Sequence, residues 1–181
     1  MNRKVRWITE TAVMLALMIV LQSLTKAAGQ IVTGSCVNAV LAMTVLIGGM
    51  GSGITVALIS PVMAYLLGIA PQFVTVPAIM VGNAVYVVLL KLIAGPKGAD
   101  YLRSVAAWLI AAAAKFAVLW ILVSKIICGI ASAPLLAGGL LKAPMLEKLP
   151  AMFTWPQLIT ALIGGAVALL IAPIIRKALH R

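Results

Sequence analysis

The sequence predicts an all-α fold, a polytopic membrane bundle of six transmembrane helices that forms a single domain over residues 1–181. Hydrophobic residues make up 64% of the chain and charged residues only 9%, a balance typical of a protein embedded in lipid. The apolar residues also form long runs, with most of the charged residues between them. Such runs cross lipid as helices, because a helix satisfies its own backbone polar groups.

Six apolar runs carry this prediction. They cover about Trp7–Thr25, Cys36–Ile47, Ile54–Ile69, Val74–Ile93, Ser104–Gly129 and Trp155–Ile175. The second run is short for a full crossing, so its helix begins earlier, tilts, or meets a thinned part of the bilayer. Pro61 in the third run predicts a kink or a local break, because proline lacks the backbone donor. The glycine-rich stretch Gly48–Gly53 predicts a tight turn before the third run.

The basic residues predict the orientation of the bundle. With the N-terminus in the cytoplasm, the inner side carries more lysine and arginine than the outer side, as the positive-inside rule requires. The inner group is Arg3, Lys4, Arg6, Lys97, Arg103, Arg176, Lys177 and Arg181, with Lys91 close to it. The outer group is Lys26, Lys125, Lys142 and Lys148. We therefore expect both termini inside and an even number of spans.

Lys115 interrupts the fifth run near its middle. At about 1.5 Å per residue it lies roughly 16 Å from one end of Ser104–Gly129 and roughly 20 Å from the other. A lysine stem snorkels over only part of that distance, so the ammonium is expected inside the membrane, where an unpaired charge costs at least about 3 kcal/mol. The three acids in the chain, Glu10, Asp100 and Glu147, lie near predicted membrane edges or in loops. The sequence therefore predicts a ligand anchor between helices. A lysine satisfied by helix-end carbonyls or a neighbouring side chain is the alternative.

Five further side chains are candidate substrate-binding residues. Asn38 and Asn83 lie inside the second and fourth runs, where each could bind a ligand or form an interhelical hydrogen bond. Gln72 sits at the predicted outer mouth, either as a first contact for a ligand or as ordinary loop polarity. Tyr86 and Trp120 could stack on the ring of a ligand or face lipid.

The segment Ile130–Thr154 is too interrupted by proline and glycine to span a membrane, yet apolar enough to lie on or dip into its surface. We expect it to cover a cavity as a lid. Cys36 and Cys128 fall near the same predicted outer face. A disulfide between them is one alternative, and two separate thiols in apolar runs is the other.

The residues that enzymes need are nearly absent. The one histidine, His180, lies in the C-terminal tail, and the three scattered acids form no carboxylate pair or metal-ligand motif. No GxxxxGK[ST] loop is present either. We therefore predict a protein that is not an enzyme, with no metal site and no cofactor. The net charge of +11 does not predict nucleic-acid binding, because the basic residues punctuate apolar runs as membrane topology requires.

Three stretches carry a resemblance to a known family. They are Ala12-x-x-x-Ala16 in the first run, TGSCVN at the start of the second, and PQFVTVPAIMVGN around the third-to-fourth turn. With the length, the six spans and the basic tails, they make the chain resemble the substrate-specific S components of energy-coupling factor (ECF) vitamin transporters. The resemblance implies a multi-pass protein of the bacterial plasma membrane that captures a vitamin or related micronutrient at its outer face. It also implies three partners: a transmembrane coupling protein, which Ala12 and Ala16 would meet, and two ATPase subunits.

Two other classes of function stay open. A stand-alone secondary transporter predicts inverted repeats and intramembrane acids, neither of which the sequence convincingly contains. A structural membrane subunit without a ligand predicts that Lys115 pairs with a neighbouring protein and that no pocket opens outward. A lysine without an acidic partner favours a ligand that carries a carboxylate or phosphate, because a desolvated cation gains most from a charged partner.

Overall fold

The computed structural model describes residues 2–70, 72–95 and 100–178, and within these ranges every regular element is helical. Lys97, His180 and Arg181, which enter the sequence-based predictions, lie outside these ranges. The longer helices are α1 (Arg3–Thr25), α2 (Gln30–Gly48), α3 (Met50–Leu66), α4 (Val76–Ala94), α5 (Tyr101–Leu119) and α8 (Trp155–Ala178). The shorter ones are η1 (Lys26–Ala28), η2 (Phe73–Thr75), α6 (Ser132–Ala137) and α7 (Met145–Met152), and a π-helical stretch, η3 (Trp120–Ile130), continues α5. The predicted all-α fold is confirmed.

Membrane-crossing length is reached by five helical stretches of the described chain. They are Lys4–Ala28, Gln30–Gly48, Phe73–Ala94, Tyr101–Ile130 and Met145–Ala178. The remaining long helix, α3, is apolar but has only 17 residues. At about 1.5 Å per residue it extends roughly 26 Å, slightly less than a hydrocarbon core of about 30 Å. The chain therefore folds as an apolar helical bundle of the kind found in membrane proteins.

Helix α2 has the earlier start that was one of the alternatives expected, and the turn before α3 is shorter than predicted. Helix α2 begins at Gln30, well before the apolar run itself, so it is long enough to cross. The predicted tight turn before α3 is present, but its predicted extent over Gly48–Gly53 is wrong, because Gly49 alone joins α2 to α3. Its φ of 88° lies in the region that favours glycine, and one such residue reverses the chain direction. The glycines that follow therefore lie inside α3.

Pro61 does not break the third helix. Helix α3 runs continuously from Met50 to Leu66 through this residue, so the alternative of a local break is wrong. The ring removes one backbone donor and leaves a carbonyl one turn earlier without its helical partner. Helices in membrane proteins tolerate this, since neighbouring groups replace the lost bond. Pro61 is itself buried.

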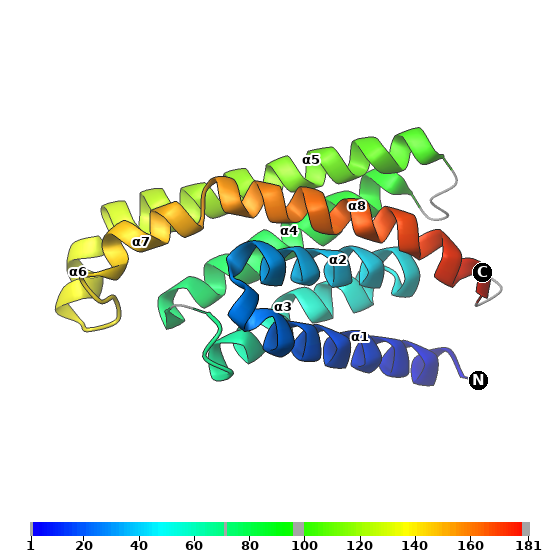
Figure 1. The fold of residues 1–181 in the computed structure, drawn as a ribbon, viewed down its shortest axis with the longest axis horizontal. Coiled ribbons are helices and arrows are strands. Elements are labelled where there is room, and N and C mark those ends of the chain that lie inside the picture. The colour runs from blue at the N-terminus through cyan, green and yellow to red at the C-terminus, as the bar shows by residue number, and fades with distance from the viewer. Residues whose placement is uncertain (1, 71, 96–99, 179–181) are drawn as a thin grey trace.

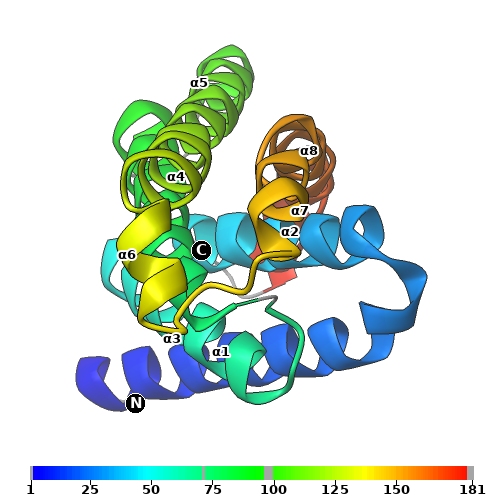
Figure 2. The same ribbon diagram turned by 90° about the vertical axis from the view of Figure 1, so that its left-hand side faces the viewer.

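Helix α2 occupies the centre of the bundle. It packs against α1, α3, α4 and α8, while α5 packs against α4 and α8. Figure 1 shows both chain ends at one end of the molecule and α6 at the other, and Figure 2 shows α1 on the opposite side from α5 and α8. The most extensive helix pairing, α2 with α8, is close because Gly164 has no side chain. A Cβ on Gly164 would lie 2.5 Å from the Ser35 carbonyl oxygen and 2.6 Å from the Ala39 nitrogen.

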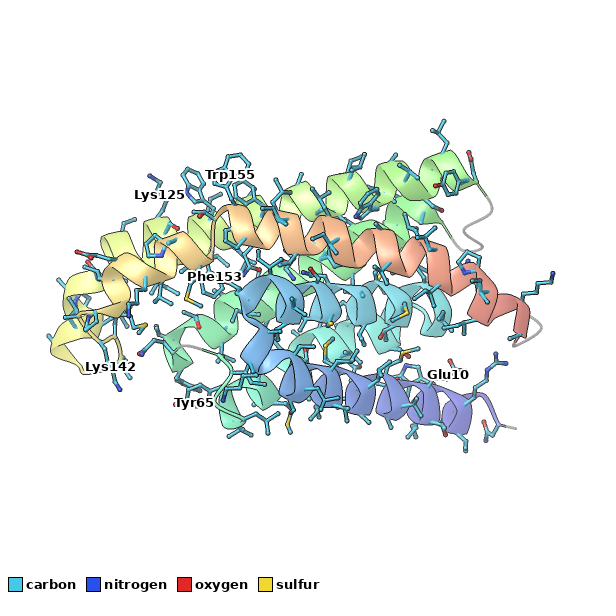
Figure 3. All side chains as sticks on the ribbon, viewed as in Figure 1. Glu10, Tyr65, Lys125, Lys142, Phe153 and Trp155 are labelled. Carbon is cyan, nitrogen blue, oxygen red and sulfur yellow. The ribbon has the colours of Figure 1, made fainter. Side chains whose placement is uncertain are left out.

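A second, smaller core forms where η3, α6 and α7 extend past the ends of α1 and α2 (Figure 1). It contains Ala78, Leu119, Val123, Ile127, Leu141, Leu149 and Phe153. The segment Ile130–Thr154 therefore folds back on η3 through two short helices, α6 and α7. Figure 3 shows Lys142 near the tip of this extension and Phe153 where α7 meets α8. Cys36 and Cys128 are free thiols, so the disulfide alternative is not realised.

Candidate functional site

A cavity of about 250 Å³ lies between the helices, toward the end of the bundle opposite the two chain ends. Helices α1, α2, α3, α4, α5, α7 and α8 all contribute to its wall. Lys26 in η1, Gln30 at the start of α2, and Met152 at the end of α7 belong to its rim. Lys115, Asn38 and Asn83, all predicted from the sequence, line its interior.

Lys115 is the centre of this site. Its side chain is only 2% exposed, and its Nζ donates to Asn38 Oδ1 at 2.6 Å and to Asn83 Oδ1 at 2.7 Å. The Tyr86 ring lies 5.5 Å from the same nitrogen, a distance at which the face of an aromatic ring attracts a cation. Helices α2, α4 and α5 therefore bring together four of the six predicted side chains.

The positive charge of Lys115 has no acidic partner among the described residues. Glu10 pairs with Arg6 at 2.9 Å, Asp100 accepts from the Leu102 amide at the start of α5, and Glu147 is exposed on α7. None of these acids lines the cavity. Two amide oxygens solvate an ammonium but do not cancel its charge, and a buried charge without a counter-ion is costly.

Packing between α2 and α8 holds Asn38 in place. Its Nδ2 donates to the Gly34 carbonyl oxygen at 2.9 Å and to Thr160 Oγ1 on α8 at 3.2 Å. These two bonds leave Oδ1 to accept from Lys115, so the orientation of the amide is fixed by its partners. The close approach at Gly164 brings α8 beside the same turn of α2. The Asn38 amide is thus fully bonded without any ligand.

Three buried polar atoms in the cavity wall have no hydrogen-bond partner among the described residues. They are Gln22 Oε1, Ser60 Oγ and Asn83 Nδ2, on side chains that are 3%, 0% and 1% exposed. Buried polar groups in folded proteins nearly always have partners, so each such exception needs an explanation. Gln22 and Ser60 were not predicted from the sequence. Like Asn38 and Asn83, they are polar side chains inside apolar runs, and this feature could have identified them.

Three of the predicted site residues, Tyr86, Trp120 and Gln72, do not line the cavity. Tyr86 is fully buried behind the cavity wall, where its hydroxyl donates to the Ala161 carbonyl oxygen at 3.3 Å. Trp120 is 39% exposed, outside the cavity lining, and Lys125 Nζ lies 4.9 Å from the centre of its ring. Gln72 precedes η2 and also lies outside the lining. The structure therefore brings neither Trp120 nor Gln72 to this cavity.

The rim of the cavity includes a second basic residue and a link between α2 and α7. Lys26 adds a second positive charge there, and its exposed side chain reaches the Leu67 carbonyl oxygen at 3.4 Å. Gln30 Nε2 donates to the Met152 carbonyl oxygen and so joins the start of α2 to the end of α7. Phe153 follows Met152 in the chain and also lines the cavity. The segment Ile130–Thr154 thus supplies part of the wall.

On the outer surface of α1, Ala12 and Ala16 are exposed. Their large apolar neighbours Val13 and Leu17 are exposed as well, by 58% and 38%. This face of α1 therefore remains open to lipid or to another protein. It lies on the opposite side of the bundle from α5 (Figure 2).

No group of three or more histidine, cysteine, aspartate or glutamate side chains suited to a metal ion gathers in the described parts of the chain. What the cavity offers instead is one buried cation, several neutral hydrogen-bonding groups and an apolar wall. Comparisons with protein-family models, curated proteins and solved structures find no match.

Proposed function

We propose that this chain is the substrate-binding membrane subunit of an ECF-type importer, an S component that captures a small anionic vitamin or micronutrient. One observation carries the proposal: Lys115 is buried in the wall of a cavity, and no carboxylate of the described residues lies beside it. An incoming anion supplies the missing counter-charge. Charge-assisted hydrogen bonds are roughly twice as strong as neutral ones, so the buried ammonium gives such a ligand a strong anchor.

The proposed topology has six spans with both termini in the cytoplasm. Helix α3 then makes the shortest crossing, and the bias of basic residues sets the orientation. Because the cavity lies at the end opposite the termini, this orientation opens it to the outside. Cysteines introduced singly as Lys142→Cys and Lys177→Cys, in a background lacking Cys36 and Cys128, test the topology. A membrane-impermeant maleimide added to cells should label only the Lys142→Cys protein, and labelling of only the other would reverse the orientation.

The proposal assigns the energy for uptake to other subunits. The sequence contains no P-loop for ATP and no acidic relay within its spans, so a separate ATPase pair and a transmembrane coupling protein supply it. The exposed Ala12 and Ala16 on α1 suit a close helix contact, since small residues let helix backbones approach. We therefore assign the meeting point with the coupling protein to this face.

Identification of a bound compound is the direct test of the binding function. The protein is purified from cells grown in rich medium, and the small molecules released on denaturation are compared by mass spectrometry with those from Lys115→Ala. We expect one acidic compound near one molecule per protein in the wild type and its loss in the variant. A wild-type protein that is empty, and that a panel of acidic vitamins does not stabilise, would favour a structural subunit instead.

A further inference from the structure

The polar groups of the cavity that can still bond to a ligand fall into two sets on different helices. Lys115 and Asn83 lie on α5 and α4, whereas Gln22 and Ser60 lie on α1 and α3. We infer that the bound compound carries two different polar groups: a carboxylate for the first pair, and a neutral hydroxyl or amide N–H for the second. This inference rests on the proposed function, since it describes the compound that the same cavity binds.

The first pair suits the two oxygens of a carboxylate. Lys115 Nζ has three hydrogens, and two of them go to Asn38 Oδ1 and Asn83 Oδ1. The third has no acceptor among the described residues. Asn83 Nδ2 belongs to the amide whose oxygen already binds the lysine, so this unpartnered donor lies beside the ammonium. One carboxylate oxygen can accept from each of them, which satisfies both donors and cancels the charge.

The second pair, Gln22 and Ser60, suits an uncharged hydrogen-bond donor on the ligand. Gln22 Oε1 is an acceptor only, and no described residue donates to it. A carboxylate placed there would meet the negative end of the amide dipole, whereas a hydroxyl or an amide N–H would donate to it. The Ser60 hydroxyl can donate or accept, so it can bind the oxygen of the same ligand group. Dicarboxylates and purely apolar acids leave Gln22 Oε1 without a partner.

Much of the remaining cavity wall is apolar. Val37, Pro61, Ile79 and Phe153 line it, from α2, α3, α4 and the junction of α7 with α8. A hydrocarbon spacer between the two ligand groups would bury its surface there. The structure thus defines a small monocarboxylate with an apolar middle and a hydroxyl or amide end, the carboxylate on the α4–α5 side.

The test uses yeast extract as the source of compounds and two matched pairs of variants. Purified protein is incubated with the extract and repurified, and the retained compounds are identified. Gln22→Leu is paired with Gln72→Leu, because Gln72 lies outside the cavity. Ser60→Ala is paired with Ser124→Ala, because Ser124 Oγ is also buried without a partner but lies outside the lining. Apparent melting temperatures in detergent show that each variant folds.

Derivatisation then counts the functional groups on the retained compound. Esterification reports carboxylates, and deuterium exchange reports further O–H and N–H groups. We expect one carboxylate and at least one further exchangeable hydrogen. Retention should fall at least about tenfold in Gln22→Leu and Ser60→Ala and stay at the wild-type level in Gln72→Leu and Ser124→Ala.

The outcomes separate the inference from the proposed function. An acid without a further exchangeable hydrogen, a dicarboxylate, or equal retention by Gln22→Leu overturns the inference and leaves anion binding at Lys115 in place. A wild-type protein that retains no acidic compound, with a cavity holding only water, overturns both.

Discussion

Lys115 and Asn83 are joined by a hydrogen bond of 2.7 Å from the lysine Nζ to the amide Oδ1, while the Nδ2 of the same amide has no partner in the described parts of the chain. A buried cation and a buried donor therefore lie next to each other at the wall of a cavity. Neither Lys115 Nζ nor Asn83 Nδ2 has an anionic acceptor among the described residues. This relationship is why we assign an acid to the cavity, and it leads to most of the predictions below.

Removal of the lysine should remove binding and leave the fold intact. Lys115→Ala is expected to weaken the affinity for the compound identified in the purified protein at least about tenfold, which corresponds to about 1.4 kcal/mol. Lys115→Met keeps most of the side-chain volume and separates the loss of charge from the creation of a cavity. Size-exclusion profiles check the fold, and binding to purified protein checks the affinity. Unchanged affinity in both variants would contradict the assignment of Lys115 as the anchor.

Asn83→Asp should fill the place of the ligand's carboxylate from within the protein. The new carboxylate would pair with Lys115, so we expect a higher apparent melting temperature for the empty protein and weaker acid binding. Asn38→Asp is the matched comparison, because Asn38 Nδ2 donates to Gly34 and Thr160 and those two bonds would be lost. Asn83→Asp should therefore be the more stable of the two. If Asn83→Asp binds the acid as well as the wild type, the carboxylate does not bind beside this residue.

Lys26 at the rim should attract an acidic compound electrostatically before that compound reaches the cavity. Its side chain is exposed, so Lys26→Ala is expected to slow the association of an acidic compound at low ionic strength by a few fold. The difference should vanish in high salt, where the Debye length shrinks to about 3 Å. Lys142→Ala, which removes an exposed charge outside the cavity lining, serves as the control. An effect that persists in high salt would indicate direct contact between Lys26 and the compound.

Gly164→Ala should separate α8 from α2. The added Cβ would meet the Ser35 carbonyl oxygen and the Ala39 nitrogen, which are backbone atoms and cannot rotate away. Overpacking of this kind costs about 1–3 kcal/mol or more, so we expect a lower apparent melting temperature and weaker acid binding. At Gly129 the nearest backbone atom would be 3.6 Å from a new Cβ, so Gly129→Ala should leave both unchanged or raise the stability slightly. Equal stability of the two variants would contradict the close packing at Gly164.

The candidate site could be predicted in part because ionic and amide groups stand out in apolar runs. Lys115, Asn38 and Asn83 were identified in this way, and all three line one cavity. Trp120 was predicted to belong to the site, although it follows Lys115 by five positions. At about 3.6 residues per helical turn, this spacing directs its side chain away from the Lys115 side of the helix. Gln22 and Ser60 carried the same polar-in-apolar signal, but the sequence does not show which face of a helix meets a cavity.

Composition and the spacing of apolar runs were enough to predict an all-helical bundle suited to a membrane, and a central lysine without an acid. Both follow from local physical chemistry, since lipid forces backbone groups into helices and makes unpaired charge costly. The partners of Lys115 follow only from the packing of the helices. Asn38 and Asn83 are 77 and 32 positions away from it in the chain, and helix contacts such as α2 against α8 at Gly164 decide that these amides meet it. The cavity itself exists only where such packing leaves space, because its wall is shared by seven helices.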